Sequence, residues 1–327
     1  AGNTSILKPS EWAPEVASVL TKMLQEYFSE EYIAIVNGDA DVSAKLVELD
    51  VDYIFFTGST SIGKLIAESA GKRLIPTTLE LGGKSPCIVD GTADLEVTAK
   101  RIVWGKFLNA GQTCVAPDYV LVEKGIKQEL IEKMNTVIER FYGPDTARSD
   151  DYPRIISDRH FTRLTRLLDS QSVVIEAGGH HDREERFLSP TLVTLKNLDT
   201  PLMQEEIFGP ILPIIGYNTL EELENMIAQN AQPLACYVFT KDPNIEQQFL
   251  YELSFGGGAI NDTVAYLGNP HMPFGGIGSS GTGAYHGKHS FDAFSHTKSI
   301  MKKSFFFDLP MRYPPYKGKL KWLKRVI

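Results

Sequence analysis

Cysteine is scarce in this 327-residue sequence, and its scarcity excludes several classes of protein. The three cysteines, Cys87, Cys114 and Cys236, are too few and too far apart for a disulfide framework. Their spacing matches no zinc-binding pattern, so we predict no metal site. We therefore expect a protein of a reducing compartment, the cytoplasm, in which any of the three could be a reactive thiol.

Long apolar runs and an excess of positive charge are also lacking. The longest apolar stretches, such as 211–216, fall well short of the roughly 18 residues of a membrane-spanning helix, and we find no signal peptide. There are 33 Lys and Arg against 41 Asp and Glu, a net charge of −8. Because nucleic acid is bound by a basic face, it is not an expected partner. At roughly 150 residues per domain, the length predicts about two domains.

Strand-like and helix-like segments alternate over the first ninety residues. Short apolar runs predict strands at 4–7, 32–36, 53–57 and 77–81. Apolar residues at helical spacing predict helices between them: the first is capped by Ser10, and two more lie at 42–49 and 62–70. This alternation is typical of a Rossmann-like α/β fold, a parallel sheet that binds ligands at the carboxyl ends of its strands.

A second α/β unit is predicted after Gly82 and Gly83. Its expected strands lie at 86–89, 119–122, 191–195, 211–215 and 236–239. Its expected helices are one capped by Thr92 or Asp94 and two at 128–141 and 220–229. The polar segments 144–152 and 178–185 are expected to be surface loops.

Two glycine-rich segments are candidates for binding phosphate. Residues 276–281 fit the G-x-G-x-x-G pattern, but prolines precede them and further glycines follow, so we favour a loop that passes close to other backbone. Residues 58–63 follow a strong strand and open a helix, where backbone N–H groups and the positive helix end meet, and Ser59 adds a hydroxyl. An ordinary helix cap explains 58–63 equally well.

Cys114 and Glu80 are the candidate reacting groups. Cys114 lies among small residues that would leave its sulfur accessible, whereas Cys87 and Cys236 lie in apolar strands and are expected in the core. Glu80 is flanked by leucines at a strand end, where an ionised carboxylate is costly unless it is paired or tuned for proton transfer. A structural cysteine and a solvent-facing carboxylate are the alternatives. The acidic turn at 205–210 can likewise be an ordinary loop.

Taken together, these segments resemble the aldehyde dehydrogenase superfamily over roughly residues 1–300. The matching segments are LKPSE (7–11), FTGS (56–59), LELGGK (79–84), GQTC (111–114), EEIFGP (205–210) and PFGG (273–276). The 34-residue separation of Glu80 and Cys114 also fits. A finer resemblance to the class 3 branch, which includes the fatty aldehyde dehydrogenases, lies at 114–119, 140–143, 285–288 and 311–315.

The resemblance implies a role for each of these segments. Cys114 would attack an aldehyde, hydride would pass to nicotinamide, and Glu80 would activate the water that releases the acid. The implied cofactor-binding residues are Lys8, Glu11, Thr57, Gly58, Ser59, Gly63, Glu206 and Phe208, and Phe274 would line the substrate pocket. The implied cofactor is NAD, with NADP also accommodated. The substrate would be a medium- to long-chain aliphatic or an aromatic aldehyde, and the protein a homodimer.

The sequence also departs from the family pattern at its start. It opens without methionine, and it lacks the Asn-Tyr-Pro-type motif that supplies an oxyanion donor in the family. We expect the cofactor sheet to be incomplete on its amino-terminal side. The isolated 327-residue chain is therefore expected to be poorly folded or inactive, and its full-length parent to be active.

The resemblance divides the chain into four parts. They are a partial NAD(P)-binding domain (1–82), a catalytic domain (83–262), a return segment with a subunit-bridging strand (263–303) and a carboxyl-terminal extension (304–327). We favour a packing role over membrane contact for the basic, aromatic extension. Two other functions compete with aldehyde oxidation: a thiol esterase using Cys114 and Glu80, and an inactive structural relative.

Overall fold

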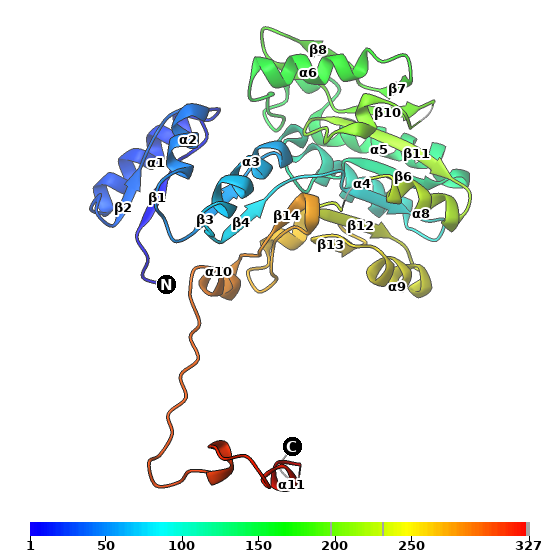
Figure 1. The fold of residues 1–327 in the computed structure, drawn as a ribbon. Coiled ribbons are helices and arrows are strands. Elements are labelled where there is room, and N and C mark those ends of the chain that lie inside the picture. Colours follow the sequence, from blue (N-terminus) through cyan, green and yellow to red (C-terminus); the bar gives the residue numbers. More distant parts are fainter. Residues whose placement is uncertain (197, 231, 325–327) are drawn as a thin grey trace. The chain divides into compact units, whose positions relative to one another are not determined.

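The amino-terminal alternation of strands and helices is present in the computed structural model, which describes residues 1–196, 198–230 and 232–324. The order is β1 (Ser5–Leu7), α1 (Pro14–Tyr27), β2 (Ile33–Ile35), α2 (Ala40–Val47), β3 (Ile54–Thr57), α3 (Thr60–Gly71) and β4 (Thr77–Glu80) (Figure 1). Strand β1 pairs in parallel with β2, and β3 in parallel with β4. The predicted α/β class is confirmed.

The expected cofactor sheet is divided into two pieces. Strands β1 and β2 form one sheet, and β3 lies at the edge of another with the order β14–β4–β3. A doubly wound dinucleotide-binding sheet has the strand order 3-2-1-4-5. Strands β2 and β1 correspond to its positions 3 and 2, and strands β3 and β4 to its positions 4 and 5. No strand of this group corresponds to the central position 1. Ile6 and Leu7 of β1 are exposed. This division agrees with the prediction of an incomplete sheet.

Helix α1 begins later than predicted. We expected Ser10 to cap it, but Pro14 occupies the first helical position after Ala13. Proline is common at the first helical position because its fixed φ suits the helix. It has no N–H, and an N–H at this position would find no acceptor within the helix. The Ser10 hydroxyl instead accepts a hydrogen bond from the N–H of Trp12 at 3.3 Å. For α4, the alternative Asp94 is correct, since its carboxylate accepts from the N–H of Val97.

The larger sheet has seven strands in the order β13–β12–β5–β6–β11–β10–β7. They are β5 (Pro86–Val89), β6 (Tyr119–Glu123), β7 (Val173–Ala177), β10 (Thr191–Leu195), β11 (Ile211–Tyr217), β12 (Ala235–Phe239) and β13 (Gly257–Ile260). All neighbours are parallel except β7 and β10. A short antiparallel pair, β8 (His181–Asp182) and β9 (Phe187–Leu188), begins in the predicted loop at 178–185.

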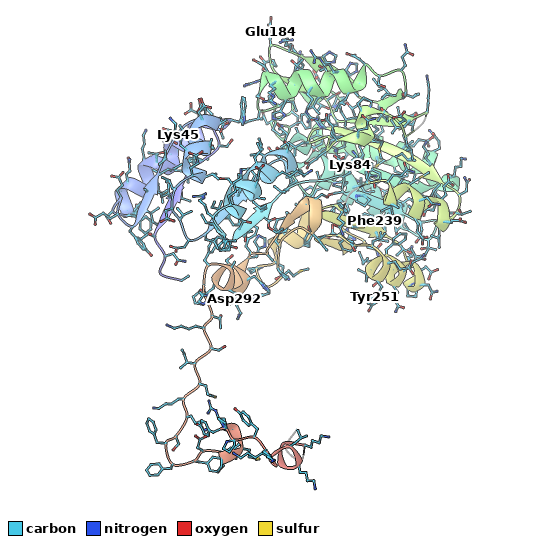
Figure 2. The ribbon with its side chains drawn as sticks, in the orientation of Figure 1. Lys45, Lys84, Glu184, Phe239, Tyr251 and Asp292 are labelled. Atoms are coloured by element: carbon cyan, nitrogen blue, oxygen red, sulfur yellow. The ribbon has the colours of Figure 1, made fainter. Side chains whose placement is uncertain are left out.

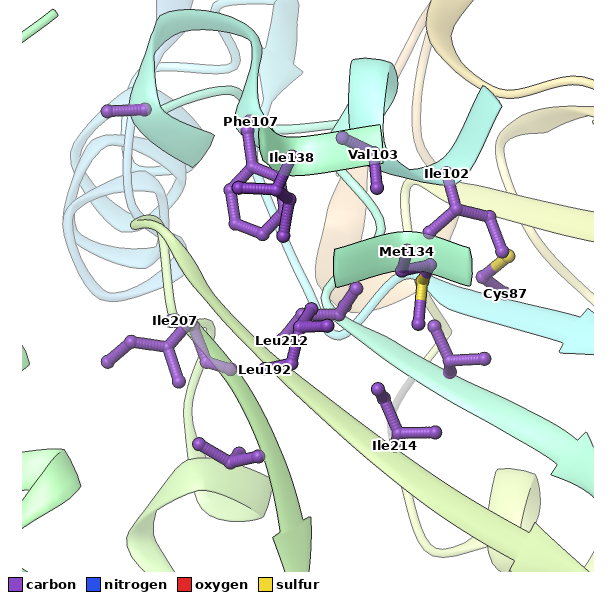
Figure 3. Close-up of a cluster of buried hydrophobic side chains, with 14 of the residues drawn as sticks. Cys87, Ile102, Val103, Phe107, Met134, Ile138, Leu192, Ile207, Leu212 and Ile214 are labelled. Carbon is purple, nitrogen blue, oxygen red and sulfur yellow. The ribbon is translucent and has the colours of Figure 1, made fainter. Parts of the chain in front are cut away.

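Helices cover both faces of this sheet. They are α4 (Leu95–Phe107), α5 (Lys127–Tyr142), α6 (Asp158–Leu168), α7 (Pro201–Gln204), α8 (Leu220–Ala228) and α9 (Pro243–Glu252). Met134 of α5 belongs to the core on one face (Figure 3), and Leu223 of α8 to the core on the other. Cys87 of β5 lies opposite Tyr237 of β12, and side chains alternate along a strand, so Cys236 points to the other face of the sheet. Cys87 and Cys236 therefore enter opposite cores, and both are buried as predicted.

The glycine-rich segment 276–281 is a close backbone contact, as we favoured. It forms a short 3-10 turn and then β14 (Gly281–Thr282), which pairs antiparallel with β4. Gly281 has φ of +142°, and a Cβ there would collide with the carbonyl oxygen of Leu79. No helix opens at this point, so the G-x-G-x-x-G pattern does not mark a dinucleotide loop here.

Helix α10 (Gly287–Ala293) ends the first structural unit, residues 1–294, and residues 295–327 form a separate unit. Residues 295–304 have no regular secondary structure, although we expected a bridging strand to reach position 303. Helix α11 (Leu320–Leu323) lies in the second unit. None of the helices in the described ranges has the length and apolar character needed to cross a membrane.

Candidate active site

Glu80 ends β4, directly beside the end of β3. Parallel pairing places it opposite Thr57, and the N–H of Gly58 donates to the Glu80 carbonyl at 3.0 Å. The carboxyl group is buried, and within the described residues neither of its oxygens has a hydrogen-bond partner. Burial raises the pKa of Glu80 from its ordinary 4.5 to about 8. A carboxyl tuned in this way can exchange a proton near neutral pH.

Cys114 lies in a turn between α4 and β6, after a loop with unusual backbone conformation. Asn109, Ala110 and Gly111 have φ of +53°, +52° and +73°. A Cβ on Gly111 would collide with the carbonyl oxygen of Gly209. The loop that carries the thiol is therefore in direct backbone contact with the acidic turn that contains Glu206.

Replacing Gly111 with alanine should disturb this contact. The added Cβ must displace the Gly209 carbonyl, and the left-handed backbone adds strain, so we expect a loss of about 2–4 kcal/mol in the free energy of unfolding. Denaturant unfolding would measure it. Gly125→Ala is the matched control, because nothing lies within 4 Å of a Cβ at that position. Equal stability of the two variants would contradict this account.

Two residues that sequence reasoning missed hold the thiol loop in place. The Gln112 amide donates to the carbonyls of Asn109 and Arg154, both at 3.1 Å, and its oxygen accepts from the N–H of Ile156 at 2.9 Å. The hydroxyl of the buried Tyr237 donates to the Val115 carbonyl at 2.6 Å. The glutamine belongs to the GQTC motif, but its partners Arg154 and Ile156 lie more than forty residues further along the chain, so the motif does not reveal them.

The thiol of Cys114 is only partly exposed. Burial, together with the charges of Glu206 and Glu80, raises its pKa from 9.0 to about 11. Both acidic groups therefore lie close enough to interact with the sulfur. The thiol keeps its proton in the ligand-free site, so an additional positive charge is needed to favour the thiolate.

The carboxylate of Glu206 lies directly against Gly82. A Cβ on Gly82 would collide with the carboxylate oxygens, so only glycine leaves room for Glu206 here. Burial raises the pKa of Glu206 to about 8, and the nearby Asp118 adds to this shift. Lys106, which sequence reasoning also missed, is fully buried, and burial lowers its pKa to about 8. The structure thus brings the partly buried Cys114 and Glu206 close to the buried Glu80, as one cluster of titratable groups.

The residues expected to hold pyrophosphate lie at the start of α3. Thr57, Gly58 and Ser59 are exposed, and the Ser59 hydroxyl accepts from the N–H of Ile62 at 3.4 Å as the helix cap. Gly63 is buried, and a Cβ there would collide with Leu81, so a small residue brings the helix close to the strand carrying Glu80. The exposed start of this helix, beside Glu80, is of the kind that can bind the phosphates of a dinucleotide.

The remaining predicted cofactor residues lie on two other segments. Lys8 and Glu11 follow β1 and form an ion pair of 2.9 Å, which places them on the separate β1–β2 piece. Phe208 follows Glu206 in a left-handed conformation with φ of +45° and is half-buried. Within the described ranges, no group of three His, Cys, Asp or Glu residues could hold a metal ion.

Cys114 packs against a core cluster that also contacts aromatic side chains. Phe274 is buried and stacks on His286, with ring centroids 5.3 Å apart. Tyr266 and Tyr285 contact the same core, and the charges of Cys114 and Glu80 help burial to raise the pKa of both hydroxyls. The surroundings of the thiol are therefore mostly apolar and aromatic, a lining suited to an apolar substrate.

Comparisons with known proteins show the family of this chain. The profile of the Aldehyde dehydrogenase family matches residues 1–300. The chain is 50% identical over 324 residues to 4,4'-diaponeurosporen-aldehyde dehydrogenase of Staphylococcus aureus (strain NCTC 8325 / PS 47), covering 99% of this chain and 71% of that protein. It is 44% identical to the dimeric NADP-preferring aldehyde dehydrogenase of Rattus norvegicus, with 98% and 71% covered. A structure of the substrate-bound state of Staphylococcus aureus AldH matches with a TM-score of 0.96 and 49% identity, with 99% and 71% covered. The chain belongs to the aldehyde dehydrogenase family.

Proposed function

We propose that Cys114 is the nucleophile and Glu80 the general base in the oxidation of an aldehyde to a carboxylic acid. The observation that carries the proposal is the convergence of the two groups at one buried site from separate segments. The Cys114 thiolate bonds to the aldehyde carbon, the carbonyl oxygen becomes an oxyanion, and the N–H of Cys114 would donate to this oxyanion. Loss of hydride from this carbon re-forms the carbonyl as a thioester.

Hydrolysis completes the proposed reaction. Glu80 accepts a proton from water, the water oxygen bonds to the thioester carbon, and the C–S bond breaks to release the acid and the Cys114 thiolate. When bound, oxidised NAD or NADP supplies the hydride acceptor and a positive charge that favours the thiolate. Since the carboxyl of Glu80 is buried and unpartnered, it can both take up and return the proton near neutral pH.

The proposed cofactor contacts follow the positions of the predicted residues. Lys8 and Glu11 would hold the adenosine ribose, and Gly58, Ser59 and Gly63 the pyrophosphate at the start of α3. Thr57 would lie near the nicotinamide, Glu206 would bind its ribose, and Phe208 would pack beside it. The exposure of residues 57–59 and their position next to Glu80 support this arrangement.

The substrate that we propose is an aliphatic aldehyde of medium to long chain or an aromatic aldehyde. The aromatic residues Phe274, Tyr266 and Tyr285 around the thiol support an apolar side chain on the substrate.

We also propose that the protein is a homodimer and that it is located in the cytoplasm. The word "dimeric" in the name of the rat relative and the free, widely spaced cysteines support these two points.

Cofactor dependence separates the proposed reaction from a thiol esterase. We expect the full-length protein to bind NAD or NADP and to form reduced nicotinamide, detected by its absorbance, when a long-chain aldehyde is added. An esterase would hydrolyse an activated ester without bound cofactor. Ester hydrolysis as the sole activity, with no cofactor binding in a fluorescence titration, would overturn the proposal.

A further inference from the structure

Lys84, the last residue of the LELGGK segment, is buried and has no role in the reaction described above. It lies between β4 and β5, in the interior of the ribbon, whereas Tyr251 of α9 lies at its outer side (Figure 2). Its ammonium group forms an ion pair with the buried carboxylate of Asp118. It also donates to the carbonyl of Leu202 at 2.7 Å and to that of Glu205 at 3.1 Å. The three ammonium protons therefore have acceptors, two of them on the segment before Glu206.

Asp118 extends this contact to the other side of Glu206. Its second carboxylate oxygen accepts from the N–H of Ile207 at 3.0 Å. Its own N–H donates to the Ser85 carbonyl at 2.8 Å, which fixes it beside the strand entered from Lys84. The buried ion pair thus contacts the backbone on both sides of Glu206.

Arg163 of α6 holds the same backbone from a different element. Its guanidinium donates to the Glu206 carbonyl at 3.3 Å and to the carbonyl of Ile207. It also pairs with the Glu205 carboxylate at 3.0 Å. Residues 206–208 have no regular secondary structure, so these side chains replace the hydrogen bonds that a helix or strand would have supplied.

We infer that Lys84, Asp118 and Arg163 are positioning residues that fix the 205–207 backbone and so hold the Glu206 carboxylate ready for the cofactor. The inference rests on the proposed contact of Glu206 with the nicotinamide ribose. A buried ion pair is no more stabilising than well-packed apolar side chains of similar size, so stability alone does not explain Lys84 and Asp118. Fixing a buried loop that must meet a ligand does explain them.

Arg163→Met tests the inference, because it removes this contact without leaving a buried charge. We expect the dissociation constant and the KM for the cofactor to rise roughly 10-fold, with the KM for aldehyde nearly unchanged. Arg166→Met is the matched control, since Arg166 is an exposed arginine of the same helix. The double variant Lys84→Met/Asp118→Leu removes both charges of the buried ion pair together, and should weaken cofactor binding in the same way.

A double-mutant cycle with Glu206→Gln separates the inference from the proposed function. If Arg163 acts through Glu206, its replacement will have little further effect on cofactor binding once Glu206 is changed. Additive effects, or a loss of stability with cofactor affinity unchanged, would overturn the inference. If Glu206→Gln alone leaves cofactor affinity unchanged, then the proposed role of Glu206 is wrong.

Discussion

Replacing Cys114 with alanine is expected to lower kcat for aldehyde oxidation by on the order of 10⁴-fold or more. Without the sulfur no thioester can form, and the remaining groups of the site have no covalent route from aldehyde to acid. Cofactor affinity should change little, because the proposed cofactor contacts lie on other segments. The rate of formation of reduced nicotinamide and a fluorescence titration of the cofactor measure the two quantities.

The other cysteines supply the controls for this experiment. Cys87→Ala and Cys236→Ala each remove a buried sulfur from the core, so we expect a loss of about 1–2 kcal/mol in unfolding free energy with kcat retained. Retention of aldehyde oxidation by Cys114→Ala would contradict the proposed mechanism. A loss of oxidation in Cys87→Ala that exceeds its loss of folded protein would contradict it as well.

Replacing Glu80 with glutamine should separate the two halves of the reaction. The amide keeps the shape of the carboxyl group but cannot accept a proton from water, so hydrolysis should slow by about 10²–10⁴-fold. Hydride transfer in the first turnover should remain, seen as a burst of reduced nicotinamide in stopped-flow absorbance. In the unmodified protein, hydrolysis should rise with pH up to about 8, where Glu80 becomes the carboxylate. The variant should lose this rise.

The same substitution should change how stability depends on pH. The pKa of Glu80 is raised from 4.5 to about 8 in the folded state, so between these values the folded protein binds a proton that the unfolded chain releases. Stability associated with Glu80 is therefore present below about pH 4.5 and is lost as the pH rises through about 8. We expect Glu80→Gln to gain stability relative to the unmodified protein over this range, measured by urea unfolding. An unchanged difference from pH 5 to pH 8 would contradict the buried, unpartnered state of Glu80.

The two candidate reacting residues could be proposed from sequence because each lies in a short local motif. Cys114 follows a run of small residues, and Glu80 ends a strand between leucines. Gln112, Tyr237 and Arg163 could not be assigned in the same way. Each acts through a partner that is distant in sequence, such as the Val115 carbonyl for Tyr237, and a single sequence contains no signal for such pairs.

The fold shows a similar division. Most of the strands and helices that we predicted lie within a few residues of their observed bounds, because the core selects apolar residues at that spacing. Helices α6 and α9 and strands β7 and β13 were not predicted, although the apolar residues of α6 recur at helical spacing. The predicted start of α1 was wrong because it rested on the capping potential of Ser10, whereas Pro14 occupies the first helical position. The strand β14 was not predicted, since its two residues, Gly281 and Thr282, are too few to show the alternation of apolar and polar residues that marks a strand. Its pairing with β4 depends on the close backbone approach at Gly281.

Trapping the covalent intermediate tests the central claim most directly. Glu80→Gln protein is mixed with NAD and a long-chain aldehyde, quenched with acid and analysed by intact-mass and peptide mass spectrometry. We predict one added acyl group on the peptide that contains Cys114, and none in the double variant Glu80→Gln/Cys114→Ala. An acyl group on another residue, or turnover with no acyl group on Cys114, would contradict the proposed mechanism.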